Sequence, residues 1–346
     1  MSRPDSSDAP GKEARKSADV AVTASKILAN IEKVILGKRQ QITLALVAYF
    51  CEGHVLLEDV PGVAKTMLAR ALARSVGCTF KRLQCTPDLL PTDVTGVSIF
   101  NQKTSEFEFR PGPIFAQTLL CDEINRTTPR TQSALLEAMA ERRVSVDGQT
   151  YTLKAPFLVI ATQNPVDHEG TFPLPEAQLD RFLIRLSLGY PSLEEEGRML
   201  QRLQRSHPID ELNPVATAAE IVACKEAVRE VHVDDKVRKY ILEIVHGTRT
   251  NDEVHLGGSP RASIALFRTA QALAAINGRG FVLPDDVKKM VLPVLGHRII
   301  LRPESRLRKV TVPALLDEIV SDQRVPVPSH QDADGGEDYV IEDDDE

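Results

Sequence analysis

The segment from Val55 to Met67 combines residue types that together could hold the phosphates of a nucleotide. An apolar strand leads into a turn at Pro61-Gly62, and Lys65 and Thr66 follow at the start of a helix. Backbone N–H groups in such a turn face phosphate oxygens, the lysine reaches the β and γ oxygens, and the threonine hydroxyl ligates Mg²⁺. The residues predicted to surround the phosphates are Pro61, Gly62, Val63, Ala64, Lys65, Thr66 and Met67.

A pair of carboxylates, Asp122 and Glu123, ends another apolar strand that begins at Thr118. The first can hold the water shell of a metal ion that Thr66 also ligates, and the second can polarise an attacking water. The two segments together predict an enzyme that hydrolyses a nucleoside triphosphate with Mg²⁺.

The phosphate-binding segment departs from its regular pattern, G-x-x-x-x-G-K-[ST], at both glycine positions. Asp59 and Ala64 occupy them. If the loop needed a positive φ at Ala64, a non-glycine residue there would cost about 1–2 kcal/mol. We therefore expect either an ordinary backbone angle at Ala64 or a somewhat weakened phosphate site.

Strands and helices alternate through the first half of the chain. Strands are predicted at His54–Glu58, Thr79–Gln84, Thr118–Asp122, Pro156–Ala161 and Phe182–Leu188, and helices precede them at Val20–Ile35 and Gln40–Cys51. This alternation predicts a parallel sheet covered by helices on both faces, with ligands at the carboxyl ends of the strands.

Two segments interrupt the alternation, and a helical region follows it. Period-two patterns predict β-hairpins over 97–109 and over 143–153, the second with Asp147-Gly148 as its turn. After Pro191 the apolar spacing is helical, with helices predicted at Leu193–Ser206, Ala218–Val231, Pro260–Ile276 and Pro284–Leu295 and an apolar stripe over 237–245. We expect a disordered tail over 1–19, an α/β nucleotide-binding domain over 20–190, an all-α lid over 191–320 and an acidic disordered tail over 321–346.

The acidic charge of the chain is concentrated at its end. Residues 331–346 carry nine acidic and no basic side chains, which leaves 40 acidic against 42 basic residues in the rest of the 346-residue chain. We interpret this tail as a solvated segment that keeps the protein soluble, with docking to a basic partner as the alternative. Because the N-terminus has no apolar stretch, the longest apolar run is short and the five cysteines lack metal-ligand spacing, a cytoplasmic protein with reduced thiols is expected.

Several further motifs, taken in order, resemble the MoxR family of AAA+ ATPases over roughly residues 20–310. The runs are LLEDVPGVAKT (56–66), TPDLLP (86–91), FRPGPIF (109–115), DEINR (122–126), QSALLEAM (132–139), ATQNP (161–165), LPEAQLDRF (174–182) and SPRAS (259–263). The resemblance implies an α/β fold: an AAA+ P-loop NTPase core, with a parallel sheet, helices on both faces and two β-hairpin inserts, followed by a small all-α lid domain. It also implies ATP and Mg²⁺ as cofactors.

The resemblance assigns catalytic roles to three further residues. Asn164 ends an apolar strand and matches the sensor 1 position, where an uncharged amide orients the attacking water. Arg261 matches sensor 2 and follows Ser259-Pro260, a pair that would cap and begin a lid helix. Arg181 matches the arginine finger, which reaches the γ-phosphate held by a neighbouring subunit.

The resemblance also bears on the assembly of subunits and on the pocket for the adenine base. A finger that cannot reach its own phosphate implies a homo-oligomer, most simply a hexameric ring. An ion pair with Asp180 or Glu176 is the alternative role for the finger arginine, and Arg126 is a second candidate for a charge across the interface. Ile35 and Gly37 match the turn that lines the adenine pocket.

The activity that the resemblance implies is chaperone-like remodelling of proteins, driven by ATP hydrolysis. Members commonly work with von Willebrand factor A domain proteins in maturing enzymes or inserting metal cofactors. The alternatives are a magnesium-chelatase-like ATPase subunit, a nucleic-acid motor or loader of the same superfamily, and a nucleotide-gated scaffold, which only Ala64 favours. The first hairpin carries one basic side chain, Lys103, and two acidic ones, Glu106 and Glu108. A DNA channel needs several basic side chains per subunit to neutralise phosphates. No nucleic-acid partner and no membrane insertion are expected.

Overall fold

A five-stranded parallel sheet forms the centre of the computed structural model, which describes residues 12–164, 170–203 and 208–326. Its strand order is β2-β5-β8-β1-β9. The strands are β1 (Val55–Glu58), β2 (Phe80–Gln84), β5 (Thr118–Asp122), β8 (Leu158–Gln163) and β9 (Ile184–Leu186). All four neighbouring pairs run parallel, which confirms the predicted sheet, and each strand overlaps its predicted range.

Helices cover both faces of the sheet, because successive side chains of each strand point to opposite faces. The helices and short 3-10 turns of this part are α1 (Lys12–Ile31), α2 (Arg39–Phe50), α3 (Lys65–Ser75), α4 (Pro91–Thr95), η1 (Pro113–Phe115), η2 (Ile124–Arg126), α5 (Pro129–Glu141) and α6 (Glu176–Leu179). Leu120 and Ile160 share one apolar core with α2 and α3. Leu119 and Val159, one residue earlier on the same strands, pack in a second core with α5.

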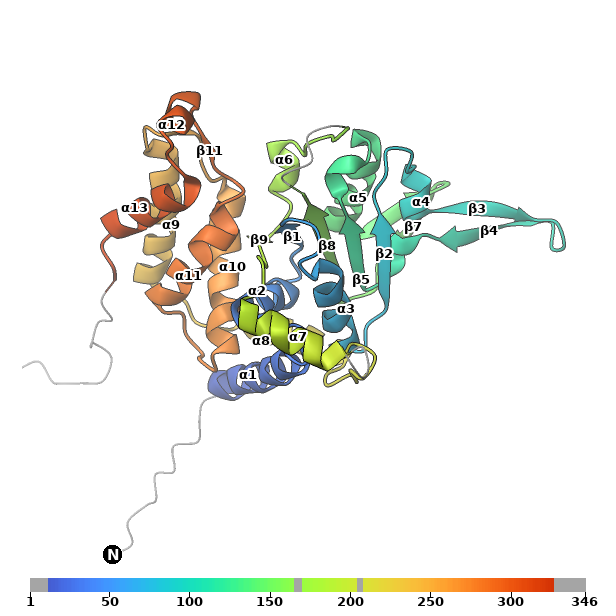
Figure 1. Cartoon of the computed structure of the whole chain (residues 1–346), viewed down its shortest axis with the longest axis horizontal. Helices are drawn as coiled ribbons and strands as arrows, with labels where there is room; N and C mark the ends of the chain where they lie inside the picture. Colours follow the sequence, from blue (N-terminus) through green and yellow to red (C-terminus); the bar gives the residue numbers. More distant parts are fainter. Residues whose placement is uncertain (1–11, 165–169, 204–207, 327–346) are drawn as a thin grey trace, which may run out of the picture.

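Both predicted hairpins are present, and the first extends from the body as an arm (Figure 1). The strands of the first hairpin are β3 (Gly96–Asn101) and β4 (Glu106–Pro111), and those of the second are β6 (Arg143–Val146) and β7 (Gln149–Thr152). Asp147 and Gly148 join β6 to β7 with φ of 51° and 77°, the positive angles that a tight two-residue turn requires. Phe109 stacks on Tyr151 with ring centroids 4.3 Å apart and so fastens the base of the arm to the second hairpin.

The region after β9 is mostly helical and forms the lid beside the sheet (Figure 1). It contains α7 (Leu193–Leu203), α8 (Ala218–Arg229), α9 (Asp235–Thr250), α10 (Pro260–Ile276), α11 (Pro284–Leu295), α12 (Pro303–Leu307) and α13 (Val312–Asp322). It also holds a short antiparallel ladder of β10 (Val254–Leu256) and β11 (Ile300–Leu301), which the prediction of an all-α lid missed. Strands this short carry no period-two pattern that a sequence could reveal. No helix in the described ranges is long and apolar enough to cross a membrane.

The first helix begins earlier than predicted and joins the sheet to the lid. Lys12–Asp19, which we had assigned to the N-terminal tail, belongs to α1. This stretch has no Gly or Pro and is rich in Lys, Ala and Glu, which are good helix formers, so apolar spacing alone placed the start too late. Farther along, Ala24 and Ile27 are fully buried, and α1 contacts α3 as well as α8 and α10 of the lid. One apolar core therefore runs from the sheet into the lid.

Candidate nucleotide site

A cavity of about 400 Å³ opens where the central strands end at their carboxyl termini, as expected for an open parallel sheet. Its walls are formed by Pro61, Gly62, Ala64, Lys65, Thr66, Arg82, Gln84, Asp122, Glu123 and Asn164. Except for Arg82 and Gln84, every one of these residues was among the predicted phosphate-binding, metal-binding or catalytic residues. The structure thus brings together segments that lie more than a hundred residues apart in the chain.

The other predicted nucleotide-binding residues lie outside this cavity. Val63 and Ile35 are buried in the apolar core, and Met67 packs against it. Gly37 has a φ of 71°, and a Cβ atom there would lie 1.4 Å from Oε1 of Glu195 on α7. This glycine accommodates the close approach of Glu195, and its predicted contact with adenine stays a prediction.

The phosphate-binding loop holds its backbone in left-handed conformations. Gly62 has a φ of 87°, and Ala64, the residue before α3, has a φ of 63° and a ψ of 24°. The ordinary angle, one of the two alternatives expected at Ala64, is therefore wrong, and the non-glycine residue there costs about 1–2 kcal/mol. The other alternative, a somewhat weakened phosphate site, stays a prediction. The chain reverses direction at this point to begin α3, and Lys65 Nζ donates a 2.7 Å hydrogen bond to the Asp59 carbonyl across the loop.

The acidic residue at the first glycine position fastens the loop to the chain beyond β9. The buried Asp59 carboxylate accepts hydrogen bonds from Ser187 Oγ at 2.8 Å, from the Gly189 N–H at 3.2 Å and from the Leu188 N–H. These three donors satisfy both oxygens of a group that burial would otherwise penalise. The Asp59 side chain therefore holds the loop against residues 187–189, a structural role at a position where the regular pattern has glycine.

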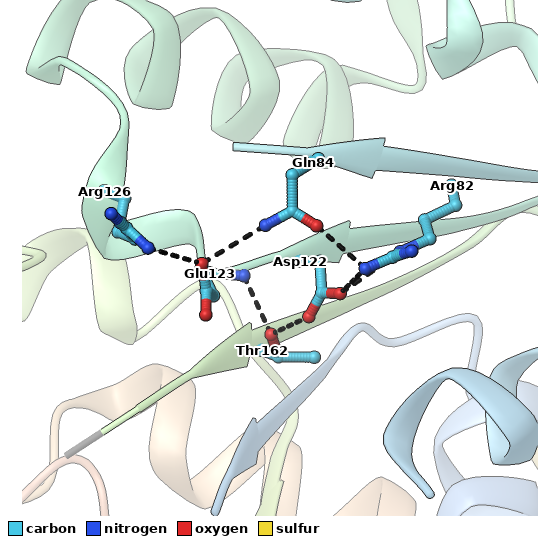
Figure 2. A network of polar contacts seen from close by, with 6 residues as sticks. All are labelled: Arg82, Gln84, Asp122, Glu123, Arg126 and Thr162. Atoms are coloured by element: carbon cyan, nitrogen blue, oxygen red, sulfur yellow. Dashed lines mark hydrogen bonds and ion pairs between the residues drawn. The ribbon is translucent and has the colours of Figure 1, made fainter. Parts of the chain in front are cut away.

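Thr162 on β8 holds the Asp122 carboxylate and the backbone of Glu123, as Figure 2 shows. Its hydroxyl donates to Asp122 Oδ1 at 2.7 Å and accepts the Glu123 N–H at 2.8 Å. Thr162 is fully buried, so this bridge is rigid. Glu123 itself has a φ of 59°, a left-handed angle that a non-glycine residue adopts at a cost and that recurs at functional sites as well as in turns.

Two polar side chains from β2 complete the site. Arg82 Nη2 lies 2.6 Å from Asp122 Oδ2, and Gln84 Nε2 donates to Glu123 Oε2 at 3.2 Å (Figure 2). Neither residue was predicted from the sequence, and Thr162 was not predicted either. A signal was present, because Arg82 and Gln84 are two apart on a strand and therefore share one face. The pairing of β2 with β5, which sets Gln84 beside Asp122, is what the sequence alone lacked.

The remaining cavity residues lie where the motifs placed them. Asn164 follows the end of β8 and is almost fully buried while lining the cavity. Arg126, predicted as a second charge for a subunit interface, contacts Glu123 Oε2 of its own chain through Nη1 at 3.2 Å. Its interface role stays a prediction.

The two other predicted arginines lie outside the cavity. Arg181 is exposed between α6 and β9 and donates through Nη1 to the Leu136 carbonyl at 2.7 Å. Asp180, which we considered as its ion-pair partner, pairs with Arg298 instead, at 2.7 Å. Arg261 is exposed in the first turn of α10. Their actions on nucleotide stay predictions.

A polar joint connects the lid to the segment that carries Arg181. Ser259 is the residue before α10, as predicted, but its hydroxyl donates to Asp180 Oδ2 at 3.2 Å and does not bond to the helix. Arg298 donates through Nη2 to the Phe182 carbonyl at 2.7 Å, and His297 Nε2 lies 2.9 Å from the same oxygen. Burial lowers the pKa of His297 well below its usual value and also lowers the pKa of Arg298.

The donor set of the cavity fits a nucleotide with Mg²⁺. Lys65 and the start of α3 provide positive charge and N–H groups for phosphates. Thr66 and Asp122 provide the hydroxyl and carboxylate oxygens that Mg²⁺ prefers, and Mg²⁺ commonly uses one or two such protein ligands together with substrate phosphates.

Comparison with known proteins agrees with this geometry. Residues 54–184 match the family described as "ATPase family associated with various cellular activities (AAA)", and residues 246–319 match the "AAA lid domain". The chain is 53% identical over 309 residues to the uncharacterised protein YeaC of Bacillus subtilis, covering 89% of this chain and 97% of that one. It is 39% identical over 313 residues to "Chaperone MoxR1" of Mycobacterium tuberculosis, covering 88% and 82%. A crystal structure of a Cytophaga hutchinsonii protein superposes with a TM-score of 0.85 at 36% identity over 90% of this chain and 98% of that one. The chain therefore belongs to the MoxR family of AAA+ ATPases.

Proposed function

We propose that this chain binds ATP with Mg²⁺ in the cavity and hydrolyses it to ADP and phosphate. The observation that carries this proposal is the meeting of Lys65, Thr66, Asp122, Glu123 and Asn164 around one opening at the strand ends. These residue types supply a cation for phosphates, oxygen ligands for a metal ion, a base and a neutral amide. An ATPase of this superfamily needs all four.

The cavity residues divide the chemistry between them. Lys65 would exchange its bond to the Asp59 carbonyl for phosphate oxygens. Thr66 and Asp122 would hold Mg²⁺, which supplies positive charge against the phosphates when bound. Glu123 polarises the attacking water from a position that Thr162 fixes through the backbone N–H. Asn164 orients the same water without repelling the γ-phosphate.

We also propose that the active unit is a ring of six identical subunits. Arg181 is exposed and lies outside its own cavity, which agrees with a finger that completes the site of a neighbouring subunit. Arg261, at the start of α10, would report the nucleotide state to the lid in the manner of a sensor 2 residue.

The work done by the ring is, in our proposal, the remodelling of protein clients in the cytoplasm. The relative from Mycobacterium tuberculosis is named a chaperone. The arm of β3 and β4 exposes Phe100 and Phe107, which suits contact with apolar polypeptide better than with phosphates. Cooperation with a von Willebrand factor A domain protein, in enzyme maturation or cofactor insertion, is the partner class we propose. Co-purification of such a protein from the native cell would test it.

Substitution of the proposed base tests the hydrolytic step. Glu123→Gln keeps the size and the hydrogen-bonding capacity of the side chain but cannot polarise water as a carboxylate does. We expect ATP binding with Mg²⁺ close to wild type and turnover lower by at least roughly 100-fold. Lys65→Ala should instead weaken ATP binding itself. Isothermal titration and a phosphate-release assay measure the two quantities separately.

The matched control is Glu304→Gln, the same change on the exposed face of α12 in the lid, which should leave both quantities unchanged. Wild-type turnover of Glu123→Gln at saturating ATP would remove Glu123 from the mechanism. Absence of ATP binding by the wild-type protein would overturn the proposal as a whole.

A further inference from the structure

The metal-ligand carboxylate of the cavity already has a cationic partner from within the chain. Arg82 contacts Asp122 Oδ2 through Nη2 at 2.6 Å and through Nε at 3.1 Å (Figure 2). The Arg82 side chain is 49% exposed, while that of Asp122 is only 13% exposed. A charge-assisted contact made by two nitrogens with one oxygen is among the stronger kinds of side-chain hydrogen bonding.

Both oxygens of Asp122 are therefore engaged, but the two partners differ in how easily they can leave. Thr162, on Oδ1, is fully buried and holds the Glu123 N–H as well. Arg82, on Oδ2, sits on a long and half-exposed side chain at the wall of the cavity. A hydrated cation that approaches Asp122 from the cavity must displace Arg82, because the threonine side is fixed.

We infer that Arg82 is a positioning residue that serves as a built-in counter-ion of Asp122 and exchanges places with Mg²⁺ when nucleotide and metal bind. This inference rests on the proposed function, in which Asp122 holds the metal. In the nucleotide-free chain Arg82 neutralises the carboxylate and keeps it oriented. Metal-free nucleotide leaves this ion pair intact, whereas the metal complex must open it.

The exchange also reaches Glu123. Arg82 Nη2 donates to Gln84 Oε1 at 2.8 Å, and Gln84 Nε2 donates to Glu123 Oε2. When Arg82 leaves Asp122, the amide of Gln84 loses the donor that orients it. Metal binding at Asp122 thereby alters the hydrogen bonding of Glu123 through Arg82 and Gln84 of β2.

The test measures ADP affinity by isothermal titration with Mn²⁺ and again with EDTA, and takes the ratio of the two affinities. The ratio isolates the contribution of the metal, because any effect of Arg82 on the phosphates themselves enters both measurements. Arg82→Gln removes the competing cation, so we expect the ratio to increase about three- to tenfold, the range for a partly exposed charge-assisted pair. Arg82→Lys keeps the charge and should restore most of the wild-type ratio.

Lys81→Gln is the matched control, since it removes the same charge one residue earlier on β2, on the opposite face of the strand. Its ratio should equal that of wild type. An unchanged or smaller ratio in Arg82→Gln overturns the inference while the proposed function stands. If Mn²⁺ fails to tighten ADP binding in wild type, or if Asp122→Asn leaves the ratio unchanged, the metal role of Asp122 is wrong and the inference is overturned with it.

Discussion

The buried histidine at the start of β1 shows how one side chain can fix the packing of three elements. His54 Nδ1 accepts the Val159 N–H at 3.0 Å, so Nε2 carries the hydrogen and donates to the Met139 carbonyl at 3.1 Å. This ring can satisfy both partners only in its neutral form, because a protonated Nδ1 would face an N–H group. Burial accordingly lowers the pKa of His54 to about 4, with Arg142 nearby acting in the same direction and Glu52 against it.

This pKa predicts that the protein loses stability in weak acid. In the unfolded chain a histidine binds a proton below about pH 6.5, whereas folded His54 stays neutral until about pH 4. Unfolding therefore takes up a proton in this window, and the free energy of unfolding falls by up to about 2 kcal/mol between pH 6.5 and 5. His297, whose pKa is also lowered by burial, adds to the same trend.

Urea denaturation at pH 7.5 and at pH 5.0 measures this effect. His54→Gln cannot be protonated and should show a smaller loss of stability between the two pH values than wild type. His246→Gln, at an exposed position of α9, should keep the wild-type loss. An equal loss in wild type and His54→Gln would show that His54 does not govern the acid sensitivity.

Some residues of the candidate site could be predicted from sequence motifs, whereas others could be recognised only from the pairing of neighbouring strands. Lys65, Thr66, Asp122, Glu123 and Asn164 were predicted because their types and local neighbours are distinctive. Arg82 lies in a run without a motif, and Thr162, although it stands inside the ATQNP run, was assigned no role. Both gain their meaning from the strands paired beside them. Of the two alternatives for Ala64, the ordinary angle was wrong, because an alanine in the sequence does not reveal the positive φ that it adopts before α3.

At the level of elements, a polar joint connects the turn after α11, which carries Arg298, to the segment between α6 and β9, which carries Arg181. Arg298 is nearly fully buried and its charge is neutralised by Asp180, while its other nitrogens donate to backbone carbonyls. Desolvation makes a buried guanidinium costly unless every donor is used and the charge is paired.

Removal of one partner from this joint should be far more damaging than removal of a surface pair. Asp180→Ala leaves the Arg298 charge buried and uncompensated, and we expect a loss of about 3 kcal/mol in the free energy of unfolding. Glu226→Ala, which removes the exposed partner of Arg229, should cost less than about 1 kcal/mol. Thermal and urea unfolding of the two variants provide the comparison, and equal losses would contradict the importance of the joint.

Most elements of the fold could be predicted, and the exceptions have physical causes. α10 and α11 begin and end where predicted, because Pro at the first helical position and a clear apolar stripe mark their bounds. The start of α1 and the ladder of β10 with β11 were missed, since charged helix formers and very short strands lack a periodic pattern. Chain order alone also could not give the strand order of the sheet.

At the scale of the whole molecule, the position of Arg181 bears on assembly. Its guanidinium is exposed and lies outside the cavity of its own chain, so an action on nucleotide requires a second subunit. Arg181→Ala subunits and Lys65→Ala subunits should each be inactive alone and should partly recover ATPase activity when mixed.

The recovery arises because some interfaces of a mixed ring pair an intact phosphate-binding loop with an intact finger. Mixing two preparations of Lys65→Ala that carry different tags is the control and should restore nothing. Light scattering or native mass spectrometry must first show that the subunits exchange. Mixed oligomers without recovery would show that Arg181 acts only inside its own chain.

The apolar core that α1 shares with the sheet and the lid has a consequence for how this chain could be divided. Ala24 and Ile27 of α1 pack in one cluster with Leu68 of α3 and with Leu266 of α10. A fragment that ends near residue 190 would expose the lid-facing side of α1 to water, and a lid expressed alone would lack the helix that covers α8 and α10. We therefore expect the two regions to be inherited together, because a recombination break at their boundary would leave apolar surface exposed on both products.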